Sequence, residues 1–457
     1  MMRAQRISHS SGLNNTKNHR RTNFKNPDKR FIGQPIFGFV RVNQPRFSPR
    51  THTKDDLYSS LRLFLIFGKL IGLMSIQGLF QKDYKKLGLR KSTFSSIIGI
   101  MIILALGVNA GVGITAFRNT ELLRMDQYAW SFAHFFYYSL GLFIFYHNYR
   151  HISKFVQIIY NWNKVHIYFT QPDAHLFRDV NLVATFIMAS AIGENVFVNL
   201  RHVPLGAETG ELLKSLNITA WELYFLRANK KWASLASYHH ALSLYTFICD
   251  KLSLYAWNYT DVTIVIFARA LYYKYQALYL EAEAVLLKGG SDVSKWLQLT
   301  TDFETMRELL DQVNNFISPL IFASYGVSIY FMCLMFHNSV NPYTNTTQVA
   351  NIYAYWAVAH LVVRVFLVSV ASARVSQWAH HITELIRRCP AEAYVMEVQR
   401  MDRYLNENVI GFTGLDCFTF TKPMILKVVG VIFSFEVVLL QALQLSLKKS
   451  SSCSPHK

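Results

Sequence analysis

Long apolar runs recur along this 457-residue chain and restrict its fold more than any other feature. A helix that crosses the hydrocarbon core of a bilayer needs about 20 mainly apolar residues. Seven segments meet this condition, so we expect an all-α polytopic membrane protein with seven transmembrane helices. The segments are residues 93–116, 130–149, 179–201, 238–268, 317–338, 349–373 and 424–447.

The composition agrees with lipid as the solvent of much of the chain. Hydrophobic residues make up 51% and charged residues 16%, with a mean hydropathy of +0.16. An ordinary soluble domain carries about a quarter charged residues. Aromatic residues reach 15%, as expected where Trp and Tyr mark the two membrane interfaces.

The basic residues that give the net charge of +19 are concentrated outside the apolar runs. Many lie in residues 1–56, a polar cytoplasmic arm that we expect to be disordered and that lacks the apolar region of a signal peptide. No zinc spacing or RNA-binding signature accompanies them, which argues against a nucleic-acid partner. The five cysteines form no CxxC pair, so we expect no disulfide framework, no metal site and no cofactor.

Loop charges set the expected orientation, because loops rich in Lys and Arg stay in the cytoplasm. The loops at 81–92, 150–178 and 374–410 are rich in both residues, whereas the loop at 339–348 contains neither. This alternation places the N-terminus in the cytoplasm and the short tail at 448–457 outside the cell.

Glycosylation sequons agree with this orientation. Those that begin at Asn217 and Asn345 fall in loops placed outside, so both are candidate glycosylation sites. A third sequon, at Asn258, lies inside an apolar run, and we expect it to be buried and unmodified.

An eighth apolar run, residues 57–80, does not fit the count of seven. It contains Arg62 and Lys69, so we expect an amphipathic helix that lies at the interface or re-enters the membrane. Residues 57–92 would then form this helix and a basic cytoplasmic loop, and residues 93–447 the seven-helix domain. A full crossing by 57–80 is the alternative, but it would place the basic arm outside.

Several passages resemble the insect gustatory receptors, and within them the sugar-taste branch. The family's last helix contains Thr-Tyr followed, after five residues, by Gln-Phe, and the sugar-taste branch has Glu after the Tyr. Residues 434–442, SFEVVLLQA, keep this spacing, the Glu and the Gln. They have Ser in place of Thr, Phe in place of Tyr, and Ala in place of the final Phe. Residues 302–334 resemble the helix that enters the fifth span, and residues 397–430 resemble the approach to the last span. Residues 257–261, WNYTD, resemble the branch's Trp-Asn-aromatic-x-Asp element. The likeness extends over residues 57–446.

The resemblance implies a tetrameric, ligand-gated, non-selective cation channel of the plasma membrane, which detects sugars in taste neurons. In this family the seventh helices of four subunits line one pore, and each subunit has its own ligand pocket among its other helices. Cytoplasmic extensions of spans four to seven form the main subunit contact. The implied partners are a small-molecule tastant such as a sugar, the lipid bilayer, and identical or related receptor subunits in a homo- or heterotetramer.

Polar side chains of the last apolar run share one helix face at about 100° per residue. Amides and hydroxyls hydrate ions without trapping them, which suits a pore wall; polar contacts between packed helices are the alternative. Because Ala442 stands where the family has Phe, the constriction is expected at Val437 or Leu440. The candidate pore-lining residues are Ser434, Val437, Leu440, Gln441 and Gln444.

Ionisable and aromatic side chains within the spans are the candidates for ligand binding. Sugars present apolar C–H faces and a rim of hydroxyls, which suits aromatic rings beside carboxylates, amides and imidazoles. Each aromatic residue could instead serve packing, and for Glu194 both ligand contact and structural pairing stay open. The candidates are Trp130, His134 and Tyr138 in the second span, Glu194, Asn195 and Asn199 in the third, and Tyr353, Trp356 and His360 in the sixth.

Other charged residues in the spans are expected to serve structure or gating. Asp250, Lys251 and Arg364 are expected to form an internal ion network. Trp257 and Asp261 lie toward the inner half of the fourth span, where packing or gating is the expected role.

Three other functions are alternatives to a sugar-gated channel. A secondary transporter would show an internal repeat and a pair of helices broken by Gly or Pro, and the sequence contains neither the repeat nor such a pair. An enzyme is not expected, because no HExxH, Ser-Lys dyad, paired intramembrane Asp or phosphate loop occurs. Within the family, the alternative is a chemoreceptor for another tastant that works only in a heteromer.

Overall fold

Long helices make up almost all of the described structure. The computed structural model describes residues 57–81, 83–88, 94–118, 125–165, 176–203, 213, 215, 217–340 and 348–452. All of these belong to the second of the two units into which the chain divides, residues 50–457. The longer helices are α1 (Leu57–Leu70), α2 (Phe94–Arg118), α3 (Met125–Val165), α4 (Leu176–His202), α8 (His240–Leu287), α9 (Val293–Val340), α10 (Gln348–Ile386), α11 (Met396–Glu407) and α12 (Lys422–Ser452).

Short elements connect these helices. Helices α6 (Ala220–Ala228) and α7 (Lys230–Ala233) precede α8, and a 3₁₀ turn, η1 (Tyr84–Lys86), follows α1. A small antiparallel hairpin of β1 (Thr413–Gly414) and β2 (Phe418–Thr419) precedes α12.

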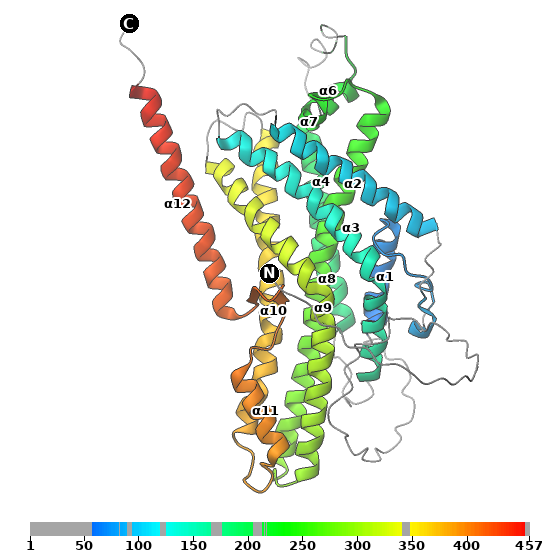
Figure 1. The fold of residues 1–457 in the computed structure, drawn as a ribbon, viewed down its shortest axis with the longest axis vertical. Coiled ribbons are helices and arrows are strands. Elements are labelled where there is room, and N and C mark those ends of the chain that lie inside the picture. The colour runs from blue at the N-terminus through cyan, green and yellow to red at the C-terminus, as the bar shows by residue number, and fades with distance from the viewer. Residues whose placement is uncertain are drawn as a thin grey trace, which may run out of the picture. The chain divides into compact units, whose positions relative to one another are not determined.

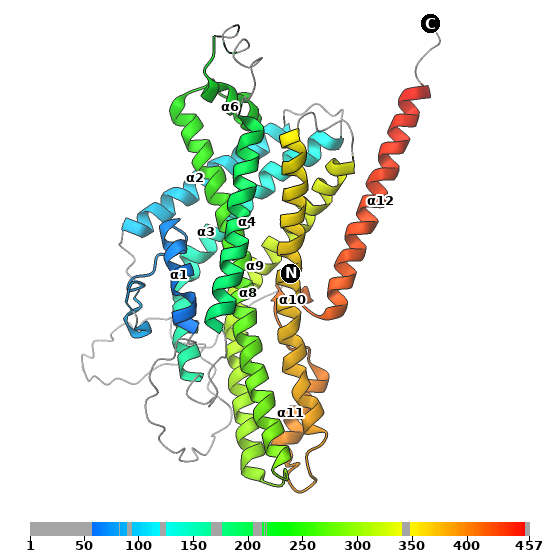
Figure 2. The same ribbon diagram turned by 180° about the vertical axis from the view of Figure 1, so that it is seen from behind.

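Helices α8 and α9 are far longer than a bilayer is thick. Each has 48 residues, which corresponds to about 72 Å, whereas the hydrocarbon core measures about 30 Å. Their connected halves continue past α2, α3 and α4, together with the end of α10 and with α11 (Figures 1 and 2). We call this extension the stalk and define it as residues 270–312 and 374–407.

Four of the seven expected spans coincide with described helices that are long and apolar enough to cross a membrane. These stretches are Phe94–Thr115, Leu176–His202, Val293–Phe336 and Asn351–Ile386. The other three expected spans fall in α3, α8 and α12. Polar residues lower the hydropathy of α3 and α8, as Asp250, Lys251 and Asp261 do in α8, whereas part of the expected span in α12 has side chains outside the described residues.

Helix α1 packs on the bundle along one face. Its 14 residues correspond to about 21 Å, which is less than the thickness of the hydrocarbon core. The ring of Phe64 stacks on that of Tyr259 with centroids 3.9 Å apart. A Cβ atom on Gly68 would lie 2.5 Å from the Tyr259 hydroxyl, so glycine allows this close approach. Leu63 and Leu70, on the other side of α1, are exposed.

A buried polar cluster joins α8, α9 and α10, and we call it the hub. Arg364 Nε lies 2.7 Å from Asp261 Oδ2, and Arg364 Nη1 donates a hydrogen bond to Asn258 Oδ1 at 2.8 Å. Ser324 Oγ donates to the other Asp261 oxygen at 2.6 Å. Trp257 completes the hub: its indole N–H donates to Ser324 Oγ at 3.1 Å, and its ring lies 4.2 Å from the Arg364 guanidinium.

The hub changes one expectation and agrees with another. Arg364 pairs with Asp261, whereas Asp250 pairs with Lys251 at 2.7 Å, so the expected single network is two separate ion pairs. Asp250 and Asp261 are three helical turns apart on α8, too far for one guanidinium to reach both. Asn258 is fully buried, as expected for that sequon.

The segment between α11 and α12 is fastened to α9. Thr413 N donates to Asn314 Oδ1 at 2.9 Å, and Leu415 N donates to Ser318 Oγ at 2.7 Å. Phe420 packs edge-on against Tyr325 of α9 at 5.1 Å. These contacts join the two longer passages that resemble the gustatory receptors, and they set the position from which α12 begins.

We predict that Arg364→Met strongly destabilises the protein, because Asp261 would be left as an uncompensated buried charge. Breaking a buried ion pair in this way costs about 3–5 kcal/mol. Thermal unfolding of the detergent-solubilised protein, followed by tryptophan fluorescence, measures the effect.

The matched control is Arg178→Met, because Arg178 is 69% exposed and lies 3.7 Å from Asp179. An exposed pair contributes about 0–1 kcal/mol, so this variant should unfold almost as the parent does. The double variant Arg364→Met/Asp261→Leu should recover much of the lost stability. Equal unfolding midpoints for Arg364→Met and Arg178→Met would show that the hub is not a main support of the bundle.

Candidate functional site

A cavity of about 150 Å³ lies between α3, α4, α6 and α8. Three helices of the bundle thus contribute to it, and α6 covers it from the loop that precedes α8. We call it the α3–α8 cavity. Its lining residues are His134, Tyr137, Tyr138, Val198, Asn199, His202, Tyr224, Ala228, Asn229, Thr246, Phe247, Asp250 and Lys251.

Hydrogen bonds and one ion pair organise the polar side of this cavity. Lys251 Nζ lies 2.7 Å from Asp250 Oδ2 and donates to Asn199 Oδ1 at 3.1 Å. The Tyr224 hydroxyl donates to the same amide oxygen at 2.8 Å. Asn199 therefore receives donors from both α6 and α8, which fixes its amide at the cavity wall.

Tyr224 contributes a hydroxyl that stays protonated. Burial, and then the nearby Asp250 carboxylate, raise the pKa of its phenol to about 12. The phenol is therefore a neutral hydrogen-bond donor at any physiological pH. Lys251 also lies 4.9 Å from the ring of Phe247, which adds a cation–π contact on the same side of the cavity.

His134 provides a polar atom that the protein itself does not satisfy. Its Nε2 is buried and has no hydrogen-bond partner among the described residues, and its ring lies edge-on to Tyr138 with centroids 4.8 Å apart. Leaving such a group unpaired costs about 1–3 kcal/mol. A ligand hydroxyl or a water in the cavity would remove that cost.

Three of the expected ligand residues, His134, Tyr138 and Asn199, line this cavity together. Asn195, one turn from Asn199, is buried and donates to the Tyr255 hydroxyl at 3.3 Å. Trp130 is 44% exposed and is not part of the cavity wall.

The remaining candidates form a contact between α4 and α10. Glu194 Oε2 lies 2.6 Å from His360 Nδ1, which is the structural pairing that the sequence left open. Trp356 packs against Phe197 with ring centroids 5.6 Å apart. The Tyr353 ring lies 5.6 Å from the Arg201 guanidinium. These residues hold α4 against α10 behind the cavity.

Several cavity residues were not expected from the sequence. The sequence favours an internal ion network for Asp250 and Lys251, and it gives no signal for Tyr137 apart from the neighbouring Tyr138. Tyr224 lies outside the apolar runs, on the short helix α6. Its position at the cavity depends on how the loop before α8 places α6 over the bundle. The adjacent opposite charges inside an apolar run were the signal that could have located this wall.

The expected pore-lining residues lie on α12, which stands apart from the bundle over much of its length (Figure 1). Ser434, Val437 and Gln441 are exposed, and Ser434 Oγ donates to Gly430 O at 2.9 Å. The side chains of Leu440 and Gln444 and the whole of Asn345 lie outside the described residues.

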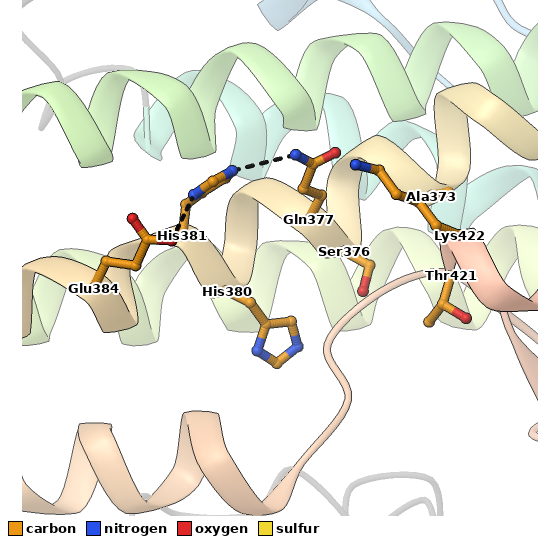
Figure 3. A pocket seen from close by; sticks show the side chains of 8 residues that line it. All are labelled: Ala373, Ser376, Gln377, His380, His381, Glu384, Thr421 and Lys422. Carbon is orange, nitrogen blue, oxygen red and sulfur yellow. Dashed lines mark hydrogen bonds and ion pairs between the residues drawn. The ribbon is translucent and has the colours of Figure 1, made fainter.

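A second hollow, of about 340 Å³, lies where α12 begins. Figure 3 shows that one face of α10 lines it, with Thr421 and Lys422 at the start of α12 on the other side. Along α10, Gln377 Nε2 lies 3.2 Å from His381 Nε2, and His381 Nδ1 lies 3.7 Å from Glu384. This groove separates the start of α12 from α10.

Within the described residues no group of His, Cys, Asp and Glu forms a metal site.

Known proteins match this chain over most of its length. The family model described as trehalose receptor matches residues 20–453. Gustatory receptor for sugar taste 64a of Drosophila melanogaster is 21% identical over 418 residues, which are 88% of this chain and 90% of that protein.

Two further Drosophila melanogaster proteins match over shorter regions. Gustatory receptor for sugar taste 64f is 26% identical over 219 residues, which are 48% of this chain and 46% of that protein. Gustatory receptor 5a for trehalose is 25% identical over 234 residues, which are 51% of this chain and 52% of that protein. In these two alignments the chain spans about half the length of its relatives.

The fold also resembles that of a solved insect receptor. The olfactory receptor OR5 of Machilis hrabei, in complex with eugenol, superposes with a TM-score of 0.65 at 12% identity. The match covers 84% of this chain and 98% of that one, so the arrangement of helices is shared over nearly the whole of that receptor.

Proposed function

The chain belongs to the trehalose receptor family, and we propose that it is a taste receptor of the plasma membrane that opens a non-selective cation channel when a small sugar or polyol binds the α3–α8 cavity. The main support for a ligand at this place is His134 Nε2, a buried polar atom at the cavity wall without a partner among the described residues. The family match supports the class of protein, and the names of its relatives support sugar as the class of ligand.

The cavity offers both kinds of contact that a sugar needs. The rings of Tyr138 and Phe247 supply apolar surface for C–H faces, and Asn199, Asp250 and Lys251 supply acceptors and donors for hydroxyls. Its volume of about 150 Å³ is below the usual range of about 300–1,000 Å³ for pockets that hold drug-sized ligands. We therefore favour a ligand of monosaccharide size, with Glu194, Asn195, Tyr353, Trp356 and His360 forming the wall behind Asn199.

The proposed route from ligand to pore passes through the hub. Asp250 and Lys251 lie on α8, the helix that also contributes Asp261 to the hub. The hub fixes α8 to α9, and α9 holds the segment before α12 through Asn314 and Ser318. A shift of α8 on ligand binding would thus act on the start of α12, which the adjoining groove leaves room to move. In this proposal four α12 helices line one pore, with the constriction at Val437 or Leu440.

We predict that sugar-evoked current depends on the cavity. Asn199→Leu and His134→Leu should each lower ligand sensitivity about two- to tenfold, because each removes at least one hydrogen bond, worth about 0.5–1.5 kcal/mol. Whole-cell current at matched surface expression, with monosaccharides, disaccharides and polyols applied in turn, is the measurement.

The control for this experiment is Asn181→Leu, which makes the same change at a partly buried position of α4 outside the cavity lining and should respond as the parent does. Equal sensitivity of all three variants would remove the α3–α8 cavity as the ligand site. Absence of current from the parent chain, alone and together with related subunits, despite surface expression, would contradict the channel itself.

We predict that Gln441→Glu and Gln441→Lys change conductance or cation preference in opposite directions, because a fixed charge at a pore wall attracts or repels permeant cations. Reversal potentials under bi-ionic conditions measure this. The neutral variant Gln441→Asn keeps an amide and should preserve ion preference. Identical permeation for the acidic and basic variants would place Gln441 outside the pore.

The proposed topology, with seven spans, a cytoplasmic N-terminus and an external C-terminus, predicts glycans on Asn217 and Asn345. Asn217 is exposed and has φ 52°, a left-handed conformation that asparagine tolerates. Removal of either residue should increase electrophoretic mobility by part of the change that enzymatic deglycosylation causes, and removal of both by the whole of it. Asn258→Gln should leave mobility unchanged. A full-length glycosylated protein whose mobility does not respond to either substitution would contradict this topology.

A further inference from the structure

The stalk contains a buried carboxyl group, one oxygen of which has no hydrogen-bond partner among the described residues. Asp302 of α9 is 3% exposed, and its Oδ2 has no partner among the described residues. Its neighbours Phe303 and Met306 on α9, and Leu278 and Ala282 on the antiparallel α8, are also buried. An ionised carboxylate in such surroundings loses its hydration without compensation, which favours the protonated form.

The charged group that acts on Asp302 is another acid. Glu281 of α8 is half-buried, and its negative charge opposes ionisation of Asp302. The cations of the same region have other contacts: Arg307 pairs with Glu304 at 2.6 Å, and Lys274 lies 5.8 Å from the ring of Trp162.

The other helices of the stalk turn apolar faces to its interior. On α11 the buried residues are Val398, Met401 and Leu405, and on the end of α10 they include Ile382, Leu385 and Ile386. Arg307 also lies against the ring of Tyr404 of α11 at 4.7 Å. Within the described stalk, therefore, the environment that favours the neutral form of Asp302 is not offset by a paired cation.

Asp302 lies outside the part of α9 expected to cross the membrane. It precedes residue 317 by fifteen positions, about 22 Å along a helix. Burial, and then the neighbouring Glu281, raise the pKa of Asp302 to about 7, and burial also raises the pKa of Glu281. Glu281 is itself only half-buried and so remains in contact with water.

We propose that Asp302 and Glu281 form a proton-binding site between α8 and α9, through which the pH of the compartment around the stalk controls the stability of the stalk. With a proton bound, Asp302 is neutral and the hairpin of α8 and α9 stays closed around it. Without the proton, two neighbouring carboxylates face each other in an apolar interior and push the two helices apart. The proposal concerns the stalk alone and does not depend on the ligand or on the pore.

The sign of the pH effect follows from the two states of Asp302. An aspartate in an unfolded chain has a pKa near about 3.9, so between roughly pH 4 and pH 7 the folded chain holds a proton that the unfolded chain has released. Stability is therefore lost as pH rises through this window and levels off above it. In the proposed orientation the stalk faces the cytoplasm, and acidification of the cytoplasm would stabilise it.

We predict that Asp302→Asn, which imitates the protonated acid, removes this part of the pH dependence. Thermal unfolding of the full-length protein in detergent is measured from about pH 5 to pH 8. The unfolding midpoint of the parent should fall relative to that of Asp302→Asn as pH rises. In Glu281→Gln the fall of the unfolding midpoint should level off at a lower pH, because removal of the neighbouring negative charge makes Asp302 a stronger acid. Glu308→Gln, at an exposed position of α9, should follow the parent.

A second measurement decides the proposal if Asp302→Asn does not fold. Infrared difference spectra of the parent between acidic and basic buffers should contain the C=O stretch of a protonated carboxylic acid. This band should disappear as pH rises, with a midpoint at about pH 7. In Glu281→Gln this midpoint should be lower. The proposal would be overturned if the unfolding midpoints of the parent and of Asp302→Asn changed equally with pH. It would also be overturned if Glu281→Gln left the infrared midpoint unchanged.

Discussion

The ion pair between Arg364 and Asp261 is the contact on which the rest of the bundle depends. Neither α8 nor α10 can rotate or slide without leaving one of these charges unpaired among apolar helices, and an unpaired buried charge costs several kcal/mol. Ser324 adds α9 to the same cluster through its bond to Asp261. The hub therefore fixes the relative rotation and height of three long helices that are otherwise joined mainly by apolar side chains, which tolerate small shifts.

The hub lies between the two places to which we assign function. Along α8, Asp250 is eleven residues from Asp261, about 16 Å, and lies at the wall of the α3–α8 cavity. Along α9, Ser318 is six residues from Ser324, about 9 Å, and holds Leu415 ahead of α12. Any rearrangement of the cavity that moves α8 must either carry the hub with it or break it. Since breaking it is costly, coupled motion of α8, α9 and α10 is the less expensive response.

A sequence pattern predicts structure correctly where a residue reports its own environment. A run of apolar residues implies lipid or core whatever the partner, so four expected spans correspond to described apolar helices. The same holds for buried Asn258, whose apolar flanks already indicated burial.

The sequence alone could not show which side chains of different helices contact one another. The sequence grouped Arg364 with Asp250 and Lys251, whereas Arg364 pairs with Asp261, because the partner depends on the relative height of α8 and α10. Glu194 could contact either a ligand or His360 for the same reason. Tyr224 was out of reach altogether, because its place at the cavity depends on how the loop returns α6 over the bundle.

Helix α12 is left largely uncovered by the rest of its own chain. It packs on the bundle through Met424, Val428 and Ile432 near its start, and beyond them Phe433, Phe435 and Val438 are exposed. Lipid solvates those apolar side chains at no cost, but it offers no hydrogen bond to the exposed amide of Gln441. That amide needs either water or a polar neighbour at the depth of the membrane. Several copies of α12 around a water-filled lumen would supply the water and leave the apolar residues against lipid and protein, so the polar face itself favours the assembly that we propose.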